Sequence, residues 1–397
     1  MMSTIDWNSP DIVLLDSIRK EGEDNRTYLF THPIMVLEVY TAQDVSVFFS
    51  RLQHALEQGY YAAGWFSYEF GYLLHPSLSH LLEERTPNVP LVWMGIFPRP
   101  RRLDEKARVK LARRKTLENM HLHLNISKKQ FMDSIREIHE YIKKGDTYQV
   151  NFTIKALFEF SQINANNPFD LYCNLRNRQS VNYGAFIRAA QVEILCLSPE
   201  LFFKKHGQKI WSMPMKGTIH RGSDEAEDHR LYRELQNDEK NRAENVMIVD
   251  LIRNDLGRIC HIGSVNVPGL FTVERYETLF QMISRVEGRV KRDFSWPSCL
   301  RALFPCGSIT GAPKLKTMEI IAGLERAPRG VYTGAIGFIS PEQDACFNVA
   351  IRTIVLKDGI GELGIGAGIT IYSDPEKEFE ETLLKAGFFT KDITYEP

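Results

Sequence analysis

Carboxylates and a lysine recur near the C-terminus at a spacing that could serve chemistry. Glu378, Glu381 and Lys385 follow one another at i, i+3 and i+7, which places two carboxylates and an ammonium on one face of a helix. An Asp-Pro pair suits the start of that helix, which we expect over 375–386. The stripe could line a cleft, although such Glu/Lys pairs are also typical of a solvated surface helix.

A further carboxylate, Glu244, stands in another predicted helix, over 239–256, one turn before Ile248 in an otherwise apolar run. A hard cation such as Mg²⁺ is bound by a few carboxylates together with ligand oxygens and water. Glu244 and Glu381 could therefore form a magnesium site. The spacing along the chain does not show that the two carboxylates meet.

Glycines alternate with other residues at Gly364, Gly366 and Gly368, just ahead of the C-terminal helix. A glycine lets backbone N–H groups approach a ligand closely, and the start of a helix favours an anion. A Gly-x-Gly pattern is most often a turn or a bulge. The segment therefore gains functional meaning only beside the acidic helix that follows it.

The composition limits the class of protein. The 397 residues suggest two or three domains or one large α/β unit, with an ordinary 43% of hydrophobic residues. No apolar run reaches the roughly 18 residues of a membrane helix, and the N-terminus has no signal-peptide pattern, so we expect a cytoplasmic protein without membrane contact. The six cysteines form no Cys-x-x-Cys pair, which argues against a zinc site or a disulfide framework.

The charge balance argues against nucleic acid as a partner. Lys plus Arg number 49 and Asp plus Glu number 50, so the surface as a whole is not an electrostatic trap for phosphates. A basic cluster at 98–115 leaves a local patch open. A solvated linker or a strand edge is the simpler interpretation of that cluster.

Helices and long strands have to position the candidate residues. The segment 127–144 should be a helix, because Ser127 and Gln130 form a capping-box pattern and Gly145 follows its last turn. Long strands in consecutive pairs separated by helices indicate an α+β layered domain. The other predicted strands are 149–158, 192–197, 332–339, 347–356 and 364–371, and the other predicted helices are 239–256, 313–324 and 375–386.

Seven ordered segments carry a resemblance to a known family: Ser198–Glu200, Pro214–Thr218, Glu244–Arg258, Gly307–Lys314, Tyr332–Gly337, Ile351–Arg352 and Gly366–Lys385. They resemble the chorismate-utilising enzymes, which include component I of anthranilate synthase, component I of aminodeoxychorismate synthase, isochorismate synthases and salicylate synthases. The resemblance implies an α+β fold, a two-subdomain α/β sandwich with large antiparallel sheets. It implies a chorismate-binding catalytic domain over 125–390, while 1–120 resembles the N-terminal region of the two amino-transferring members.

The resemblance also implies a metal and a set of substrate contacts. Mg²⁺ holds the ring carboxylate of chorismate in this family, and the matching ligands are Glu244 and Glu381, with Glu378 in support. An Arg and a Tyr hold the other carboxylate, as a dianion requires. The substrate-binding residues implied in this way are Tyr332, Arg352, Gly366, Gly368, Lys385, Thr218 and Gln149.

Glu200 and Gln149 both bear on the implied chemistry. Glu200 matches the general acid that protonates the departing C4 hydroxyl, which requires a raised pKa. Isochorismate and salicylate synthases resemble one another in using a lysine base to activate water, and Gln149 stands at that position here. Because an amide cannot take a proton from water, Gln149 favours amination over hydration.

Lys216 separates the two amination branches. Anthranilate synthases have alanine at this position, whereas aminodeoxychorismate synthases have lysine, whose neutral amine can attack C2 and split one displacement into two. The resemblance therefore implies the aminodeoxychorismate synthase component I branch. Anthranilate synthase component I and a non-catalytic chorismate-binding regulator remain the alternatives.

Two positions depart from the family pattern, and one partner is implied. Gln281 stands where many amination members have histidine, and Asn182-Tyr183 replaces a Pro-aromatic pair that binds tryptophan in some relatives, so we carry over neither feature. No segment resembles a glutaminase. Ammonia should therefore come from a separate glutamine amidotransferase subunit.

Overall fold

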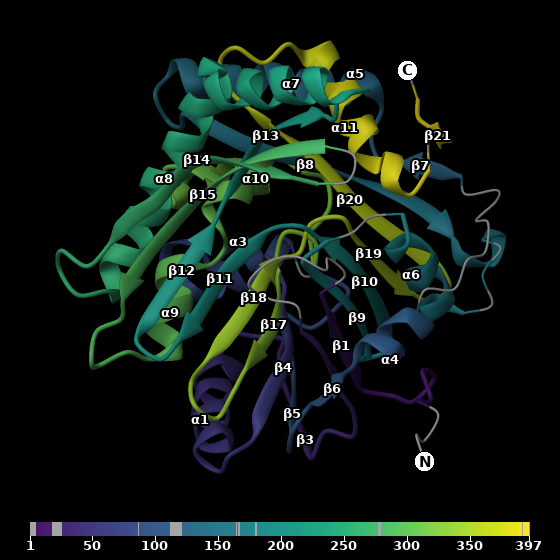
Figure 1. Ribbon diagram of the computed structural model, residues 1–397, viewed down its shortest axis with the longest axis vertical. Coiled ribbons are helices and arrows are strands. Elements are labelled where there is room, and N and C mark those ends of the chain that lie inside the picture. The colour runs from purple at the N-terminus through teal and green to yellow at the C-terminus, as the bar shows by residue number, and fades with distance from the viewer. Residues whose placement is uncertain are drawn as a thin grey trace.

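The computed structural model describes residues 5–17, 26–85, 87–111, 121–163, 165, 167–178, 181–276, 279–390 and 392–396. Within these residues the chain forms an eleven-stranded and a ten-stranded sheet (Figure 1). The first sheet runs β21-β7-β8-β20-β19-β10-β9-β1-β2-β6, with β16 paired to β8. The second runs β13-β15-β12-β11-β18-β17-β4-β5-β3, with β14 paired to β15.

The strands of the first sheet are β1 (Ile12–Asp16), β2 (Thr27–Phe30), β6 (Arg101–Leu103), β7 (Leu122–Leu124), β8 (Gln149–Glu159), β9 (Tyr183–Ala189), β10 (Val192–Ser198), β16 (Gly311–Ala312), β19 (Thr353–Lys357), β20 (Ile360–Ile369) and β21 (Ile393–Thr394). Those of the second are β3 (Met35–Val39), β4 (Tyr61–Phe66), β5 (Val92–Phe97), β11 (Leu201–His206), β12 (Lys209–Met213), β13 (Met215–His220), β14 (Asn266–Arg275), β15 (Leu279–Arg289), β17 (Ala335–Ile339) and β18 (Ala345–Val349).

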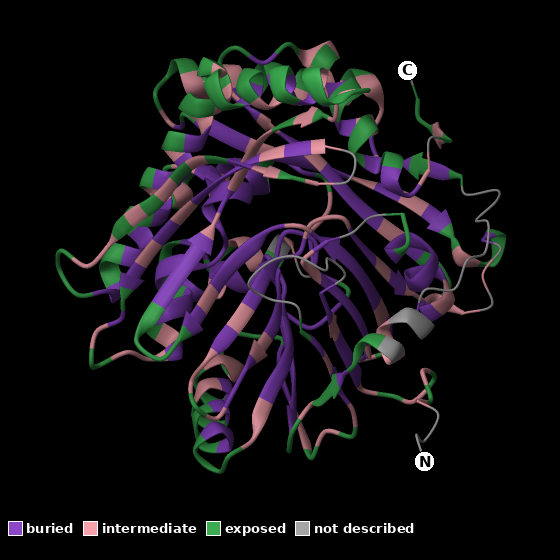
Figure 2. Ribbon diagram, viewed as in Figure 1, coloured by how far each residue is buried: buried purple, intermediate pink, exposed green. Residues whose placement is uncertain are grey.

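A buried apolar layer joins the two sheets. Residues of β1, β9 and β10 in the first sheet and of β4, β5 and β17 in the second form one cluster. Within it the Trp65 and Trp93 rings stack with centroids 5.3 Å apart. Figure 2 shows the buried residues following the strands, while exposed residues follow the outer helices. The predicted α+β sandwich with large antiparallel sheets is confirmed.

Helices cover the outer surfaces of the sheets (Figure 1). Phe131 of α5 packs against Phe152 of β8 and Phe379 of α11, which fixes these helices over the first sheet. No described helix is both long and apolar enough to cross a bilayer. The helices are α1 (Asp44–Glu57), α2 (Phe70–Leu74), α3 (Leu81–Glu84), α4 (Glu105–Lys110), α5 (Lys128–Lys143), α6 (Pro168–Arg176), α7 (Glu225–Asn237), α8 (Glu239–Ile259), α9 (Trp296–Leu303), α10 (Lys314–Leu324) and α11 (Pro375–Lys385).

Local signals placed most of the predicted elements correctly. Ser127 caps α5 and forms the predicted capping box with Gln130. Helices α8, α10 and α11 and strands β8, β10 and β20 also lie where predicted. The predicted boundary near residue 120 falls between β6 and β7, and each sheet takes strands from both sides of it.

Two strand predictions were wrong in detail. The segment 347–356 is not one strand: the chain leaves β18 in the second sheet and enters β19 in the first, with Arg352 at φ +50° between them. The strand predicted over 332–339 begins only at Ala335, because Thr333 has φ +60° and the chain turns there. β-branched and aromatic residues continue through both breaks, so strand propensity alone does not reveal them.

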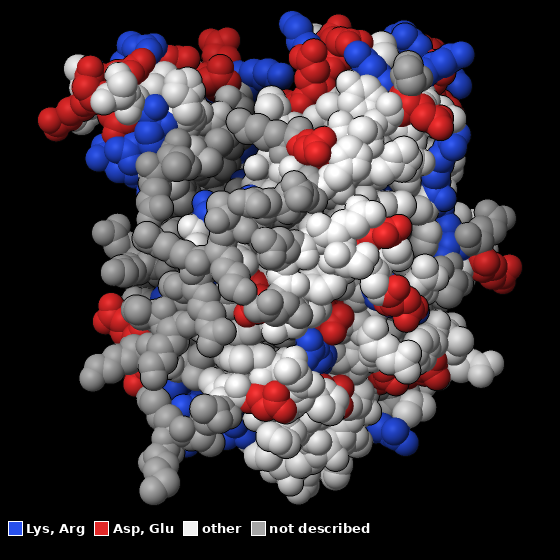
Figure 3. Space-filling view, turned by 90° about the vertical axis from the view of Figure 1, so that its right-hand side faces the viewer, with Lys and Arg blue, Asp and Glu red and all other residues white. Residues whose placement is uncertain are grey.

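Charged side chains are distributed without a dominant sign. Figure 3 shows acidic and basic groups interspersed toward the upper end of one face, with uncharged residues across much of its middle. Within the basic cluster, Arg101 and Arg102 lie in β6 at the edge of the first sheet, which is one of the two arrangements expected for that cluster. Residues 112–115 of the cluster lie outside the described residues.

Candidate active site

Glu200 lies where the chain crosses from β10 to β11, and so from the first sheet to the second. A second crossing, at Arg352, runs beside it: Val349 N donates to Glu200 O at 3.1 Å, and Leu197 N donates to Arg352 O at 3.1 Å. Strand pairing therefore places Glu200 and Arg352 next to each other, although they are 152 positions apart in the chain.

The Glu200 side chain is held in a buried position. It is 5% exposed, and Ser308 Oγ donates a hydrogen bond to its Oε1 at 2.6 Å. Burial raises the pKa of Glu200 to about 7, against the opposing effects of Ser308 and Lys216. A carboxyl group with this pKa can carry a proton near neutral pH, as the implied general acid requires.

Lys216 stands on a β-bulge in β13. Met215 pairs with Ile283 and Thr218 with Gln281, so β13 has one more residue than β15 between these pairs. Gly217 has φ +83°, which glycine adopts without strain, and a Cβ there would lie only 2.8 Å from Asn241 Cγ. The bulge thus interrupts the regular alternation of side chains between the two faces of β13 at Lys216.

Four charged groups surround Lys216, from α8, α11 and the β10–β11 crossing. Burial lowers the pKa of its ammonium, and Lys385 lowers it further. Three carboxylates oppose that shift: Glu244, Glu200 and Glu381. The structure therefore brings together the two ends of the predicted site, from β13 and α8 on one side and from α11 on the other.

Gln149 and Gly368 form the opposite wall beside Lys216. Gln149 is 1% exposed, and its Oε1 has no protein partner. A Cβ on Gly368 would lie 2.8 Å from Gln149 Nε2 and 3.4 Å from Lys216 Nζ. Glycine at position 368 therefore leaves room for the side-chain ends of Gln149 and Lys216.

The glycine segment of β20 forms a strand, as predicted, and one edge of that strand is open. β20 pairs with β8 as far as Ile369, whereas β19 covers it only as far as Leu363. Thr153 faces Gly366, and Asn151 faces Gly368. The backbone N–H of Thr153 donates to the Glu325 carboxylate and that of Asn151 donates to Thr310 O, so neither donates to β20. By the alternation of an antiparallel ladder, the Gly366 and Gly368 amides point to the open edge.

The acidic face of α11 lies beside that edge. Lys385 Nζ donates to Gly366 O at 3.0 Å and pairs with Glu381 at 2.9 Å. Burial alone would raise the pKa of Glu381, but three lysines outweigh it and lower that pKa: Lys385, Lys240 and Lys216. Burial raises the pKa of Glu378, and the neighbouring Glu381 adds to that shift. Helix α11 is therefore not simply a solvated surface helix, because its charged side chains interact with β20 and Lys216.

Glu244 and Glu381 are the carboxylates that would hold Mg²⁺ here, together with further oxygen donors. Among the described residues no group of three or more His, Cys, Asp or Glu side chains is close enough together to hold a metal ion alone. Glu244 and Glu381 both raise the pKa of Lys216, so both carboxylates lie near its ammonium. Carboxylate oxygens suit Mg²⁺ when substrate oxygens and water complete the coordination shell.

Tyr332 and Arg352 lie near each other through the backbone, since Thr333 N donates to Ala350 O at 2.8 Å. Tyr332 is 8% exposed, packs against Gly364, and has a pKa raised far above its ordinary value by burial, so its hydroxyl stays neutral. Burial lowers the pKa of Arg352, which Tyr276 partly offsets. Thr218 is exposed and donates to Gln281 Oε1 at 2.8 Å.

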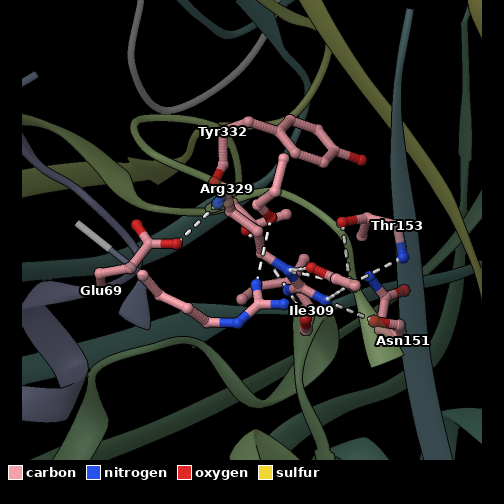
Figure 4. A network of polar contacts seen from close by, with 10 residues as sticks. Glu69, Asn151, Thr153, Ile309, Arg329 and Tyr332 are labelled. Atoms are coloured by element: carbon pink, nitrogen blue, oxygen red, sulfur yellow. Dashed lines mark hydrogen bonds and ion pairs between the residues drawn. The ribbon is translucent and has the colours of Figure 1, made fainter. Parts of the chain in front are cut away.

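A buried ion-pair network lies behind the site (Figure 4). Arg329 pairs with Glu325 at 2.7 Å, and both side chains are 2% exposed. Arg329 also donates to Ile309 O and to Asn151 O, and so ties the Ser308 segment to the strand that carries Gln149. Glu69 accepts from the amides of Arg329 and Gly330, which connects the N-terminal region to the same network.

Sequence reasoning missed Ser308, Gln281 and this network. Ser308 lies in one of the segments that carried the resemblance, and Gln281 was noted only as a departure from it. Their contacts join positions 108 and 64 residues apart in the chain, so no local pattern could reveal them.

A cavity of about 600 Å³ lies apart from these residues. It is lined by β1, β2, β9, β11 and β17 and includes Asn182 and Tyr183. None of the predicted site residues lines it.

Comparison with known proteins places the chain in a family. The family model for chorismate binding enzymes matches residues 12–391. The chain is 43% identical over 263 residues to the aminodeoxychorismate synthase of Arabidopsis thaliana chloroplasts, 65% of this chain and 28% of that protein. It is 40% identical over 256 residues to aminodeoxychorismate synthase component 1 of Bacillus subtilis, 64% of this chain and 54% of that protein.

The second amination branch is similarly close. Anthranilate synthase component 1 of Aquifex aeolicus is 38% identical over 269 residues, 68% of this chain and 54% of that protein. These alignments thus span about half or less of each relative's length. Among solved structures, anthranilate synthase component I of Streptococcus pneumoniae matches with a TM-score of 0.78 at 24% identity, covering 97% of this chain and 93% of that one. At that identity the likeness supports the fold alone.

Proposed function

Because the chain belongs to the chorismate-binding enzyme family, we propose that it is the chorismate-aminating component I of an aminodeoxychorismate synthase. The observation that carries the proposal is the position of Lys216. Its Nζ lies beside Gln149 and the open glycine edge of β20, within the electrostatic reach of Glu200. A lysine whose pKa is lowered there can act as a nucleophile, which an alanine could not do.

The proposed reaction has two steps, which pass through a covalent adduct of Lys216. The neutral Lys216 amine forms a bond to C2 of chorismate as both conjugated ring double bonds shift by one position and the C4–O bond breaks. Glu200 gives its proton to the departing hydroxyl, which leaves as water, and it recovers a proton from the new secondary ammonium. Ammonia then bonds to C4, the bond from C2 to the lysine nitrogen breaks, and the lysine takes up a proton released by the incoming ammonia.

The other residues bind and orient the substrate in this proposal. Tyr332 and Arg352 would hold one carboxylate of chorismate, and the Gly366 and Gly368 amides with Lys385 would hold charge at the open edge. Mg²⁺ bound by Glu244 and Glu381, with Glu378 in support, would neutralise the ring carboxylate. Gln149 cannot activate water, which keeps the site from hydrating C2.

The test is the identity of the product. The protein would be given chorismate, Mg²⁺ and ammonium, and the product treated with a lyase that releases 4-aminobenzoate. Formation of 4-aminobenzoate supports the proposal, and anthranilate as the main product would overturn it. A Lys216→Ala variant should lose most amination, while unchanged turnover would remove the lysine from the mechanism.

Anthranilate synthase component I is the second candidate, because relatives with that name match almost as closely. A regulator that binds chorismate without turnover would show tight, Mg²⁺-dependent binding and no product. A further part of the proposal is a separate glutaminase partner. Glutamine should support amination only when such a subunit is added, whereas ammonium should support it without one.

A further inference from the structure

The Gln281 side chain contacts Gly217 and Thr218, the two residues of β13 that follow Lys216. Its Nε2 donates to Gly217 O at 2.8 Å, and its Oε1 accepts from Thr218 Oγ1 at 2.8 Å. Both atoms of the primary amide are therefore used, one on each of the two residues that follow Lys216. A bulge removes its residues from regular ladder hydrogen bonds, so this side chain replaces contacts that the strand pairing cannot make.

The same strand also holds the helix that carries Glu244. Ser284 Oγ donates to Asn245 Oδ1 at 2.6 Å, and Ser284 N donates to Pro214 O at 3.1 Å. Gly217 meanwhile packs against Asn241, one turn before Glu244 on α8. β15 is thus the common frame for the lysine bulge and the acidic helix.

We propose that Gln281 is a positioning residue, which fixes the Lys216–Gly217–Thr218 bulge so that the lysine amine is held in line with the reacting carbon. The proposal rests on the proposed function, in which Lys216 is the nucleophile. An amide suits this task, since it donates and accepts at once and stays uncharged at every working pH. A proton-transfer role for this position is not needed to explain its contacts.

The decisive variant is Gln281→Met, which keeps the length of the side chain and removes both hydrogen bonds. Displacing a nucleophile by a fraction of an ångström raises the activation barrier. We therefore expect kcat to fall about 10- to 100-fold, with KM for chorismate nearly unchanged. Gln281→Glu should recover only part of the loss, because it keeps the acceptor for Thr218 and loses the donor to Gly217 O. Gln281→His, which can still donate through a ring N–H, should recover more than methionine.

Gln208→Met is the matched control. Gln208 is an exposed glutamine at the β11–β12 turn of the same sheet, and its Oε1 accepts from Arg289 at 3.0 Å. This variant loses one side-chain hydrogen bond far from the bulge. Its kcat and KM should match those of the unaltered protein.

Hydrogen–deuterium exchange of peptides covering 215–220 gives a readout that does not depend on catalysis. Faster exchange there in Gln281→Met, with an unchanged melting temperature and a lower kcat, supports the proposal. Unchanged exchange would overturn it, because the bulge would then be held without Gln281. Faster exchange with unchanged kcat would overturn the catalytic part. If Lys216→Ala also keeps full activity, the proposed function fails as well, and the two failures are thereby distinguished.

Discussion

Replacing Ser308 by alanine should raise the pKa of Glu200 and extend activity to higher pH. Ser308 Oγ donates to Glu200 Oε1 at 2.6 Å, and this bond favours the charged carboxylate over the protonated acid. Without the donor, the buried carboxylate loses stabilisation while the neutral acid loses little. The pKa therefore moves upward from about 7.

The size of the shift follows from the burial of the pair. Glu200 and Ser308 are each 5% exposed, so water cannot fully replace the lost hydroxyl. A hydrogen bond to a charged group is worth about 1.5–3 kcal/mol, and one pKa unit corresponds to about 1.4 kcal/mol. The alanine variant should thus show a Glu200 pKa raised by about one to two units.

The assay is the pH dependence of kcat/KM for chorismate at a fixed concentration of neutral ammonia. Because the acid has to be protonated, activity falls as the pH rises through its pKa, and the alkaline limb should move up with the pKa. Ser308→Thr keeps the hydroxyl and serves as control. A folded alanine variant in which neither limb of the pH profile moves would refute Glu200 as the titrating acid.

Three further predictions follow from the site. Gly368→Ala would place a Cβ 2.8 Å from Gln149 Nε2 and 3.4 Å from Lys216 Nζ, so steady-state kinetics should show kcat/KM lowered about tenfold or more with little change in melting temperature. Glu381→Gln removes a carboxylate proposed to bind Mg²⁺, and titration should show that half-maximal activity needs at least about tenfold more Mg²⁺; an unchanged requirement would exclude this ligand. Glu200 has a folded pKa raised from 4.5 to about 7, so its contribution to stability is fully present below 4.5 and is lost as the pH rises through 7. Glu200→Gln should remove that loss, at most about 3 kcal/mol, from the pH dependence of urea unfolding.

The parts of the fold that were predicted depend on short stretches of sequence. The capping box at Ser127 and the acidic helix after Asp374 are complete within a few residues, and both helices formed where expected. The two sheets followed from the family resemblance and not from periodicity. Strand propensity was misleading at Arg352, since apolar and β-branched residues continue through a point where the chain changes sheets.

The family resemblance predicted most of the site residues, but how they meet depends on tertiary contacts. Gln149, Lys216 and Gly368 come from β8, β13 and β20, and their convergence is a property of how the sheets lie together. Ser308 has no chemical signal of its own, because a serine in a glycine-rich turn is common. Only its contact with a buried carboxylate gives it a function.

Lys216 and Glu200 form a coupled pair, and the proposed mechanism requires both to be neutral. Burial acts on both in this direction, whereas their mutual attraction favours the ammonium and carboxylate. The neutral pair and the ion pair contain the same number of protons, so pH does not choose between them, and the two limbs of a pH profile belong to the pair.

The Ser308→Ala variant can therefore tell which form dominates. If the neutral pair dominates, Glu200 is the last of the two to titrate, and only the alkaline limb moves up. If the ion pair dominates, Glu200 titrates first, so the acidic limb moves up instead and the maximum activity rises because more of the neutral form is present. The limb that moves thus identifies the resting state of the site.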